Sequence, residues 1–277
     1  MASALAQRLR GYPTELLYNL TLRELRGKFK RSALGWLWSI INPIANIAVY
    51  SVVFGIFFDV VAPVGDPSGL EAYALFLVAG LLPWTFLANG LSASAGSVVA
   101  NESLVTKVYF PRSVLPAAAV AAWLASYGIE LLVFGVLLLV VGNMILPWVP
   151  LVIALMLLQA AFVLGVGMIL AAVNVYFRDV QHFLAIFLNM WFYATPVLYP
   201  PDLPPERYEL LGLDLPVRDL LALNPMAIFV AAYRDLLYHL RFPEPSQWAV
   251  LGFGSLATLA VGLLVFSRFE PRLAEVL

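Results

Sequence analysis

Aromatic side chains are the residues in this sequence best suited to bind a substrate. An aromatic ring presents a flat apolar face that stacks on the C–H face of a sugar, and tyrosine and tryptophan add a polar group. The rings fall in two apolar segments: Trp36, Trp38, Tyr50 and Phe54 in the first, and Phe187, Trp191 and Tyr193 in the second. Because Trp and Tyr also gather at both faces of a membrane, packing in such a belt stays an alternative for each ring.

Residues for other chemistry are missing from the sequence. It has no GxxxxGK[ST] phosphate loop, so it does not bind ATP in the usual way. The two histidines, His182 and His239, stand alone, with no HExxH motif or metal-ligand spacing. No cysteine is present, which excludes disulfides and thiol catalysis. We therefore expect no metal and no catalytic site in this chain.

Glu130 is the one acid inside an expected membrane span. A charge at that depth is costly unless it faces a partner or a cavity. Two interpretations stay open: a structural bond to a neighbouring helix or subunit, and a role in a substrate pathway. Ion-coupled transporters usually carry several such groups, so a single glutamate favours a conduit driven by energy from elsewhere.

The composition predicts an all-α integral membrane protein. The chain is 62% hydrophobic and 12% charged, whereas soluble domains are about 45–50% apolar and about 25% charged. A spanning helix needs roughly 20 mostly apolar residues. Six segments meet this requirement: 37–58, 72–91, 115–141, 151–175, 183–199 and 248–266.

The charges predict how these spans are oriented. If the N-terminus is cytoplasmic, twelve of the 16 Lys and Arg residues lie in cytoplasmic segments, and ten of the 17 acids lie outside. The positive-inside rule therefore places both termini in the cytoplasm. The long connection at about residues 200–247 is then external.

Residues 1–36 form a cytoplasmic N-terminus ahead of the membrane domain, residues 37–277. One apolar stripe, formed by Tyr18, Leu22, Leu25 and Phe29, predicts a helix that starts near Thr14. Basic residues lie on another face, so the helix suits the membrane interface. A simple anchor for topology is the alternative.

Two cytoplasmic loops have features that suit docking to a soluble partner. Asn101 can cap a short helix from Glu102 to about Tyr109. Each loop carries an aromatic residue close to an arginine, in Phe110-Pro-Arg112 and in Phe177-Arg178. The alternative is that these arginines only set the topology.

The external connection contains an apolar stretch, Asp219–Leu240, interrupted by Asn224-Pro225. Counted as a span, it would put the termini on opposite faces and spoil the charge asymmetry. We therefore expect a re-entrant helical hairpin between the fifth and sixth spans. Backbone of this kind occurs at membrane depth only where protein or a cavity surrounds it, which points to a pathway.

Four segments, in order, resemble the membrane subunits of type-2 ABC exporters that move lipid-linked polysaccharides such as O-antigen and teichoic acid. They are LRELRGKFKRSALGWLWSIINPIANIAVYSVVFGIFF, LLPWTFLANGLSASAGSVVANESLVTKVYFPRSVLP, NVYFRDVQHFLAIFLNMWFYATPVLYP and LNPMAIFVAAYRDLLY. The resemblance covers about residues 14–270. Residues 204–219 make the external connection longer than the family's compact form.

The resemblance implies a permease subunit in the bacterial cytoplasmic (inner) membrane. It would pair with a second copy and with two copies of an ATPase subunit, which would bind ATP and Mg. The cargo would be a polyprenyl-diphosphate-linked glycan of the O-antigen, teichoic-acid or galactan type, and we expect no nucleic-acid partner. The alternatives are an exporter of drugs or small lipids, and a membrane enzyme acting on polyprenyl phosphate.

The resemblance also implies roles for particular residues. The first and fifth spans would line the channel, which assigns to the pathway the aromatic residues named above together with Asn42 and Asn46. Proline removes one helical hydrogen bond, so Asn42-Pro43 would kink the first span. Four cations would meet the diphosphate where the substrate enters, although lipid headgroups attract the same charges: Arg26, Lys28, Lys30 and Arg31. Coupling to the ATPase would use Glu102, Lys107, Arg112, Arg178 and Asp179. The outer gate would contain Asn224, Pro225 and Tyr233.

Overall fold

The computed structural model describes residues 2–28, 37–57, 63–210 and 213–277. Trp36, Lys30 and Arg31 lie outside the described residues, and so do the side chains of Asn42, Asn46 and Phe54.

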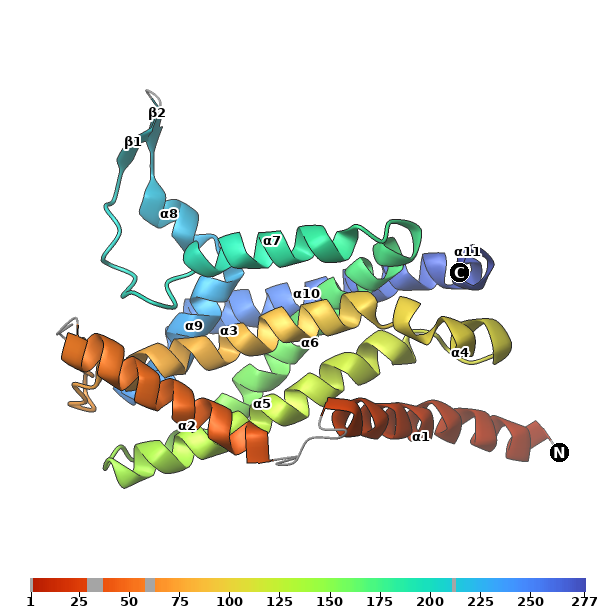
Figure 1. Cartoon of the computed structure of the whole chain (residues 1–277), viewed down its shortest axis with the longest axis horizontal. Coiled ribbons are helices and arrows are strands. Elements are labelled where there is room, and N and C mark those ends of the chain that lie inside the picture. The colour runs from red at the N-terminus through yellow and green to blue at the C-terminus, as the bar shows by residue number, and fades with distance from the viewer. Residues whose placement is uncertain (1, 29–36, 58–62, 211–212) are drawn as a thin grey trace.

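The described chain is a bundle of helices packed around α3 (Tyr73–Gly96), as Figure 1 shows. Four helical stretches there are long and apolar enough to cross a membrane: α3, α5 (Val114–Val140), Leu146–Tyr176 and Pro245–Arg272. The third comprises η4 (Leu146–Trp148) and α6 (Val149–Tyr176), and the fourth begins with α10 (Pro245–Phe269). The most apolar stretch of α3 is 83% buried, against 22–33% in the other three. The sequence of α3 is apolar on every side because neighbouring helices surround it.

Two shorter helical stretches lie where the first and fifth spans were predicted. The first comprises α2 (Trp38–Tyr50) and a π-helix, η2 (Ser51–Phe57). The second is α7 (Val180–Tyr193). α2 is continuous through Asn42-Pro43, and the winding changes at Ser51. The predicted kink at the proline therefore stays a prediction.

The N-terminal helix α1 spans Ala2–Lys28 and so begins before Thr14. Leu20 and Leu25 are buried, whereas Tyr18 is exposed, so the predicted apolar stripe is only partly right. The reason is that α1 packs on α5 and on a cluster near α4, and these contacts choose the buried face. Figure 1 shows both termini at the same end of the bundle as α4.

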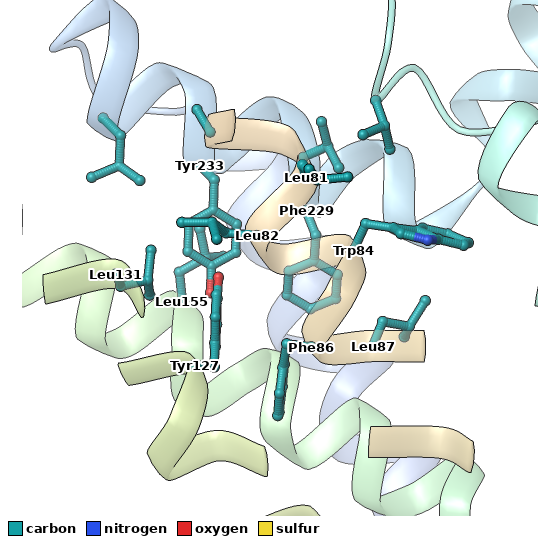
Figure 2. Close-up of a cluster of buried hydrophobic side chains, with 14 of the residues drawn as sticks. Leu81, Leu82, Trp84, Phe86, Leu87, Tyr127, Leu131, Leu155, Phe229 and Tyr233 are labelled. Carbon is teal, nitrogen blue, oxygen red and sulfur yellow. The ribbon is translucent and has the colours of Figure 1, made fainter. Parts of the chain in front are cut away.

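Two hydrophobic clusters hold the bundle together. Figure 2 shows the main one, where side chains from α3, α5, α6 and α9 meet. In it Phe86 stacks on Tyr127 with ring centroids 4.9 Å apart. The second cluster gathers residues of η3 (Val99–Asn101), α4 (Glu102–Lys107) and α11 (Leu273–Val276) under the neighbouring helix ends.

Glycines bring α6 and α10 into backbone contact. A Cβ atom on Gly262 would lie 2.2 Å from the carbonyl oxygen of Gly165. A Cβ on Gly165 would lie 2.4 Å from the carbonyl oxygen of Thr258. Small residues permit such close approach between membrane helices, which gain little from the hydrophobic effect in lipid.

The described chain is all-helical except for one short hairpin, in the connection at about residues 200–247. Strands β1 (Tyr208–Leu210) and β2 (Leu213–Leu215) pair antiparallel, with Tyr208 opposite Leu215. Both strands alternate apolar and acidic residues, a pattern that suits a strand.

A broken helical segment follows the strands. It comprises α8 (Val217–Ala222), α9 (Pro225–Arg234) and a π-helix, η5 (Asp235–His239). The predicted break at Asn224-Pro225 is confirmed, because α8 ends at Ala222 and α9 begins at the proline.

Candidate functional site

Trp191 and Asn224, predicted for the pathway and the outer gate, meet where α7 ends and α9 begins. The indole Nε1 of Trp191 donates to Oδ1 of Asn224 at 2.8 Å, and the same oxygen accepts from the backbone N–H of Met226 at 3.0 Å. Asn224 is therefore the N-cap of α9. Its Nδ2 donates to the carbonyl oxygen of Ala194 at 3.1 Å and to Oγ1 of Thr195 at 2.9 Å. One amide thus joins the two helices.

Aromatic contacts fix Trp191 on its other sides. The ring of Trp84, a buried residue of α3, meets it edge-on with centroids 5.8 Å apart. Phe187 lies one turn earlier on α7, with its ring centroid 5.3 Å from that of Trp191. The side chains of Phe187 and Tyr193 are 55% and 64% exposed. α7 therefore presents an open aromatic face with one immobilised tryptophan.

An open cavity of about 430 Å³ lies beside this junction. It is lined by Trp191, Ala194, Val217, Leu221, Leu223, Asn224 and Pro225. This lining offers a ring, an amide and aliphatic surface, and no ionisable group for acid–base chemistry. The part of the chain that the structure describes also holds no group of three or more His, Asp or Glu residues suited to a metal ion. Because hydrogen bonds within the chain already engage the Asn224 amide and the Trp191 indole N–H, the site suits weak stacking on the indole ring.

Tyr233 does not belong with the other two predicted gate residues. Its side chain is fully buried in the main cluster, where its ring packs edge-on against Tyr127. α9 turns this position toward α5, whereas Asn224 and Pro225 face α7. Its role in the described chain is therefore packing.

Among the described residues, the helices that carry the two aromatic groups lie on different sides of the bundle. Figure 1 shows α2 and α7 packed against α3 from different sides. The side chain of Trp38 is 40% exposed, and Tyr50 packs on the main cluster.

At the opposite end of the bundle, the two predicted coupling loops come together. Nη2 of Arg178 lies 3.9 Å from Oε2 of Glu102. Both side chains are about half exposed or more, so the pair adds little stability. It does show that both loops form one surface, on which Lys107 and Asp179 are also exposed.

One of the two predicted aromatic residues, Phe110, does not lie on this surface. Phe110 is buried in the second cluster, and its neighbour Tyr109 is 95% exposed instead. Phe177 is 69% exposed, as a docking residue requires. Arg112 is engaged within the chain, because its Nη1 donates to the carbonyl oxygen of Glu270 at 2.5 Å.

Of the cations predicted to meet the diphosphate, Arg26 is exposed, whereas Lys28 is turned inward. The Nζ of Lys28 lies 3.2 Å from the ring centroid of Trp123 and donates to Oγ of Ser126 at 2.9 Å. Burial lowers the pKa of Lys28 to about 8, and the charge of Glu130 opposes this shift. Glu130 thus has a cationic neighbour on another helix, which favours the structural interpretation of that residue.

Residues 15–238 match the family described as ABC-2 type transporter. The chain belongs to the ABC-2 type transporter family. It is 31% identical over 270 residues, 96% of each chain, to the "O-antigen export system permease protein RfbA" of Klebsiella pneumoniae. It is 32% identical over 261 residues, 94% of each chain, to the Myxococcus xanthus protein of the same name. It is 26% identical, over 91% of this chain and 92% of the relative, to the "Polysialic acid transport protein KpsM" of Escherichia coli.

Sequence reasoning missed several residues that shape the sites of this ABC-2 type transporter. Trp84 and Thr195 hold the Trp191–Asn224 junction, and Tyr109 projects from the loop surface. Arg234 was counted only as an external cation. Its position within the apolar segment that Asn224-Pro225 interrupts was the available signal, because charged residues in such a segment often have a specific partner.

Proposed function

We propose that this chain is the membrane subunit of an ATP-driven exporter that carries a polyprenyl-diphosphate-linked polysaccharide from the cytoplasm to the outer face. The observation that carries the proposal is similarity, over nearly the full length of both chains, to proteins named as O-antigen export permeases. The relative named for polysialic acid transport handles a second polysaccharide. Two glycan cargoes among the relatives favour a polysaccharide over drugs or small lipids.

The proposed topology has six spans: α2 with η2, α3, α5, α6, α7 and α10. Residues 1–36 form the cytoplasmic part with its interface helix, and residues 37–277 form the membrane domain. Residues 219–240 form the external re-entrant hairpin. In support, the termini and α4 share one end of the bundle while α9 and the strands lie toward the other (Figure 1). The excess of Lys and Arg at the first end makes it the cytoplasmic one in a bacterial inner membrane.

A second copy would complete the pathway. Within one copy, α2 and α7 pack on different sides of α3, so a channel lined by both aromatic groups needs the α7 face of one copy to approach the α2 face of another. Exposed apolar side chains run along α7 at helical spacing, and they supply such a face: Phe183, Ile186, Phe187, Met190 and Tyr193. An exposed apolar face of this kind marks contact with lipid or with another protein, and the proposal assigns it to the second copy.

The energy source would be two ATPase subunits, which bind ATP and Mg and dock on the loop surface. Both loops present exposed aromatic and charged groups there: Glu102, Lys107, Tyr109, Phe177, Arg178 and Asp179. Exposed aromatic residues beside charges are typical of interface anchors with polar rims. Because the two cytoplasmic loops lie side by side, one ATPase subunit would contact both of them.

The outer end of the pathway would lie at the Trp191–Asn224 junction. A passing glycan would stack on the tryptophan ring, which the hydrogen bond to the amide holds in place. Such contacts are individually weak, and a moving chain needs contacts that form and break quickly.

Export by Trp191→Ala tests this assignment. The permease is expressed together with the ATPase encoded beside it, in a host strain whose native permease has been deleted. Surface glycan is measured at equal amounts of assembled complex. We expect export to fall several-fold, since one aromatic stacking contact is worth about 1 kcal/mol. Trp148→Ala is the matched control, because Trp148 is a partly buried tryptophan outside the site. Equal export by parent and Trp191→Ala would remove the stacking role, and purified permease without any associated ATPase would contradict the exporter itself.

A further inference from the structure

Arg234 is a buried cation whose contacts join three elements. It lies at the C-terminal end of α9 and is 3% exposed. Its Nη1 donates to the carbonyl oxygen of Pro196 and its Nη2 to that of Val197, both at 2.6 Å. Its Nε donates to the carbonyl oxygen of Phe76 on α3 at 3.3 Å, and Cζ lies 3.7 Å over that residue's ring. One guanidinium therefore joins α9 to α3 and to the turn after α7.

Carbonyl groups and a ring face, and not a carboxylate, balance this charge. The adjacent acid, Asp235, pairs with Arg241 at 2.6 Å, and no ion pair found among the described residues includes Arg234. Pro196 and Val197 lie in the turn after α7, and their backbone carbonyl oxygens are strong hydrogen-bond acceptors. A planar fork of donors matches two neighbouring carbonyl oxygens. Since an apolar side chain often stabilises a buried position as well as an ion does, stability alone is a poor reason for this arginine.

α3 leaves the space that the guanidinium occupies. A Cβ atom on Gly80 would lie 2.9 Å from Nη2 of Arg234 and 3.1 Å from Cγ1 of Val230. Any side chain at this position would push the arginine away from its carbonyl partners. Glycine inside a helix is otherwise unfavourable, so its presence here is explained by the arginine.

We propose that Arg234 is a positioning residue that holds the outer end of α7, and with it the Trp191–Asn224 junction, in the geometry used for transport. Two residues connect α9 to residues 194–197 through hydrogen bonds: Asn224, just before the helix, and Arg234, at its last position. The end of α7 and the hairpin therefore move together. This inference rests on the proposed function, because it assumes that the junction lies on the substrate path.

The test uses the absence of native cysteine. Val197→Cys places one thiol on the gripped turn, at a side chain that is 0% exposed, and leaves the backbone carbonyl in place. Val98→Cys places a matched thiol in the second cluster, also at 0% exposure. The rate of maleimide labelling is measured on the full chain with its ATPase in lipid nanodiscs. The first thiol reports release of the turn, and the second reports general unfolding.

Each thiol is then combined with three substitutions. Arg234→Lys keeps the charge and loses the fork of donors, and Gly80→Ala displaces the guanidinium without changing it. Gly90→Ala is the control on the same helix, where an added Cβ would meet Cγ1 of Val163 at 2.7 Å and not Arg234. We expect the first two to raise labelling at position 197 by at least about tenfold, because losing charged hydrogen bonds favours local opening. Position 98 should not change, and glycan export should fall in the same two variants only.

Three results would overturn the proposal. These are unchanged labelling at position 197 in both variants, equal increases at positions 197 and 98, and increased labelling at 197 with full export although Trp191→Ala lowers export. Failure of the proposed function looks different. In that case Trp191→Ala exports normally while Arg234→Lys still releases the turn, so the grip of Arg234 stands and the substrate path lies elsewhere.

Discussion

Asn224→Asp separates the two structural tasks of the Asn224 side chain. The aspartate keeps an oxygen that accepts from the N–H of Met226 and from the indole of Trp191, so the cap of α9 remains. It loses the NH₂ group that donates to Ala194 and Thr195. The hydroxyl proton of Thr195 is already donated to the carbonyl oxygen of Trp191, so no donor faces the new carboxylate oxygen. Asn224→Ala loses both tasks.

The expected magnitudes follow from these bonds. Two lost hydrogen bonds at about 1 kcal/mol each weaken the tie between α7 and α9 by about 2 kcal/mol in the aspartate variant. That energy corresponds to about 30-fold more frequent opening. The alanine variant also loses an N-cap, worth about 1 kcal/mol, and the partner of the Trp191 indole.

Hydrogen exchange followed by mass spectrometry measures the two tasks separately. In Asn224→Asp, peptides covering residues 190–198 should exchange faster while the first turn of α9 stays protected. In Asn224→Ala both regions should exchange faster. The reasoning is wrong if the aspartate variant loosens the first turn of α9 as much as alanine does, or leaves residues 190–198 as protected as in the parent.

Three further predictions concern the rest of the chain. Gly262→Ala forces a Cβ against the carbonyl of Gly165 and should lower stability by about 1–3 kcal/mol. Gly252→Ala is the control and should not lower it, because nothing lies within 4 Å of the added atom. Equal midpoints of thermal unfolding in detergent would contradict the close packing of α6 on α10. Glu102→Arg should reduce stimulation of the ATPase. It should leave the melting temperature unchanged, since the exposed pair with Arg178 contributes little to stability. Unaltered stimulation would count against docking on this surface. Lys28 has a folded pKa of about 8 against the ordinary 10.5, so the unfolded state binds more protons between these values and this residue makes stability rise with pH in that window. The melting temperature of the parent should therefore rise relative to that of Lys28→Met as the pH is raised from 8 to 10.5. A difference that stays constant over this range would show that Lys28 is not buried.

The break at Asn224-Pro225 illustrates what local sequence determines. Proline fixes its own backbone and restricts the residue before it, so the helix had to restart there whatever surrounds it. Asparagine is a strong N-cap, which made Asn224 recognisable as well. The meeting of the Glu102 and Arg178 loops follows from topology, because segments after an even number of spans return to the same side. The composition required membrane helices for a similar reason, since lipid tolerates only long, apolar, internally bonded segments.

The side of a helix that a residue faces was decided only by tertiary packing. Tyr233, Phe110 and Lys28 were assigned to functional surfaces, and the structure places all three against neighbouring helices. They lie at the end of α1, in the loop after α4 and in the short helix α9, where too few residues repeat for an apolar pattern to show which side is buried. The buried partners of Arg234 likewise could not be predicted from the sequence. They are backbone carbonyl groups far away in the chain, which every residue possesses, and only the fold brings them within 2.6 Å of one guanidinium.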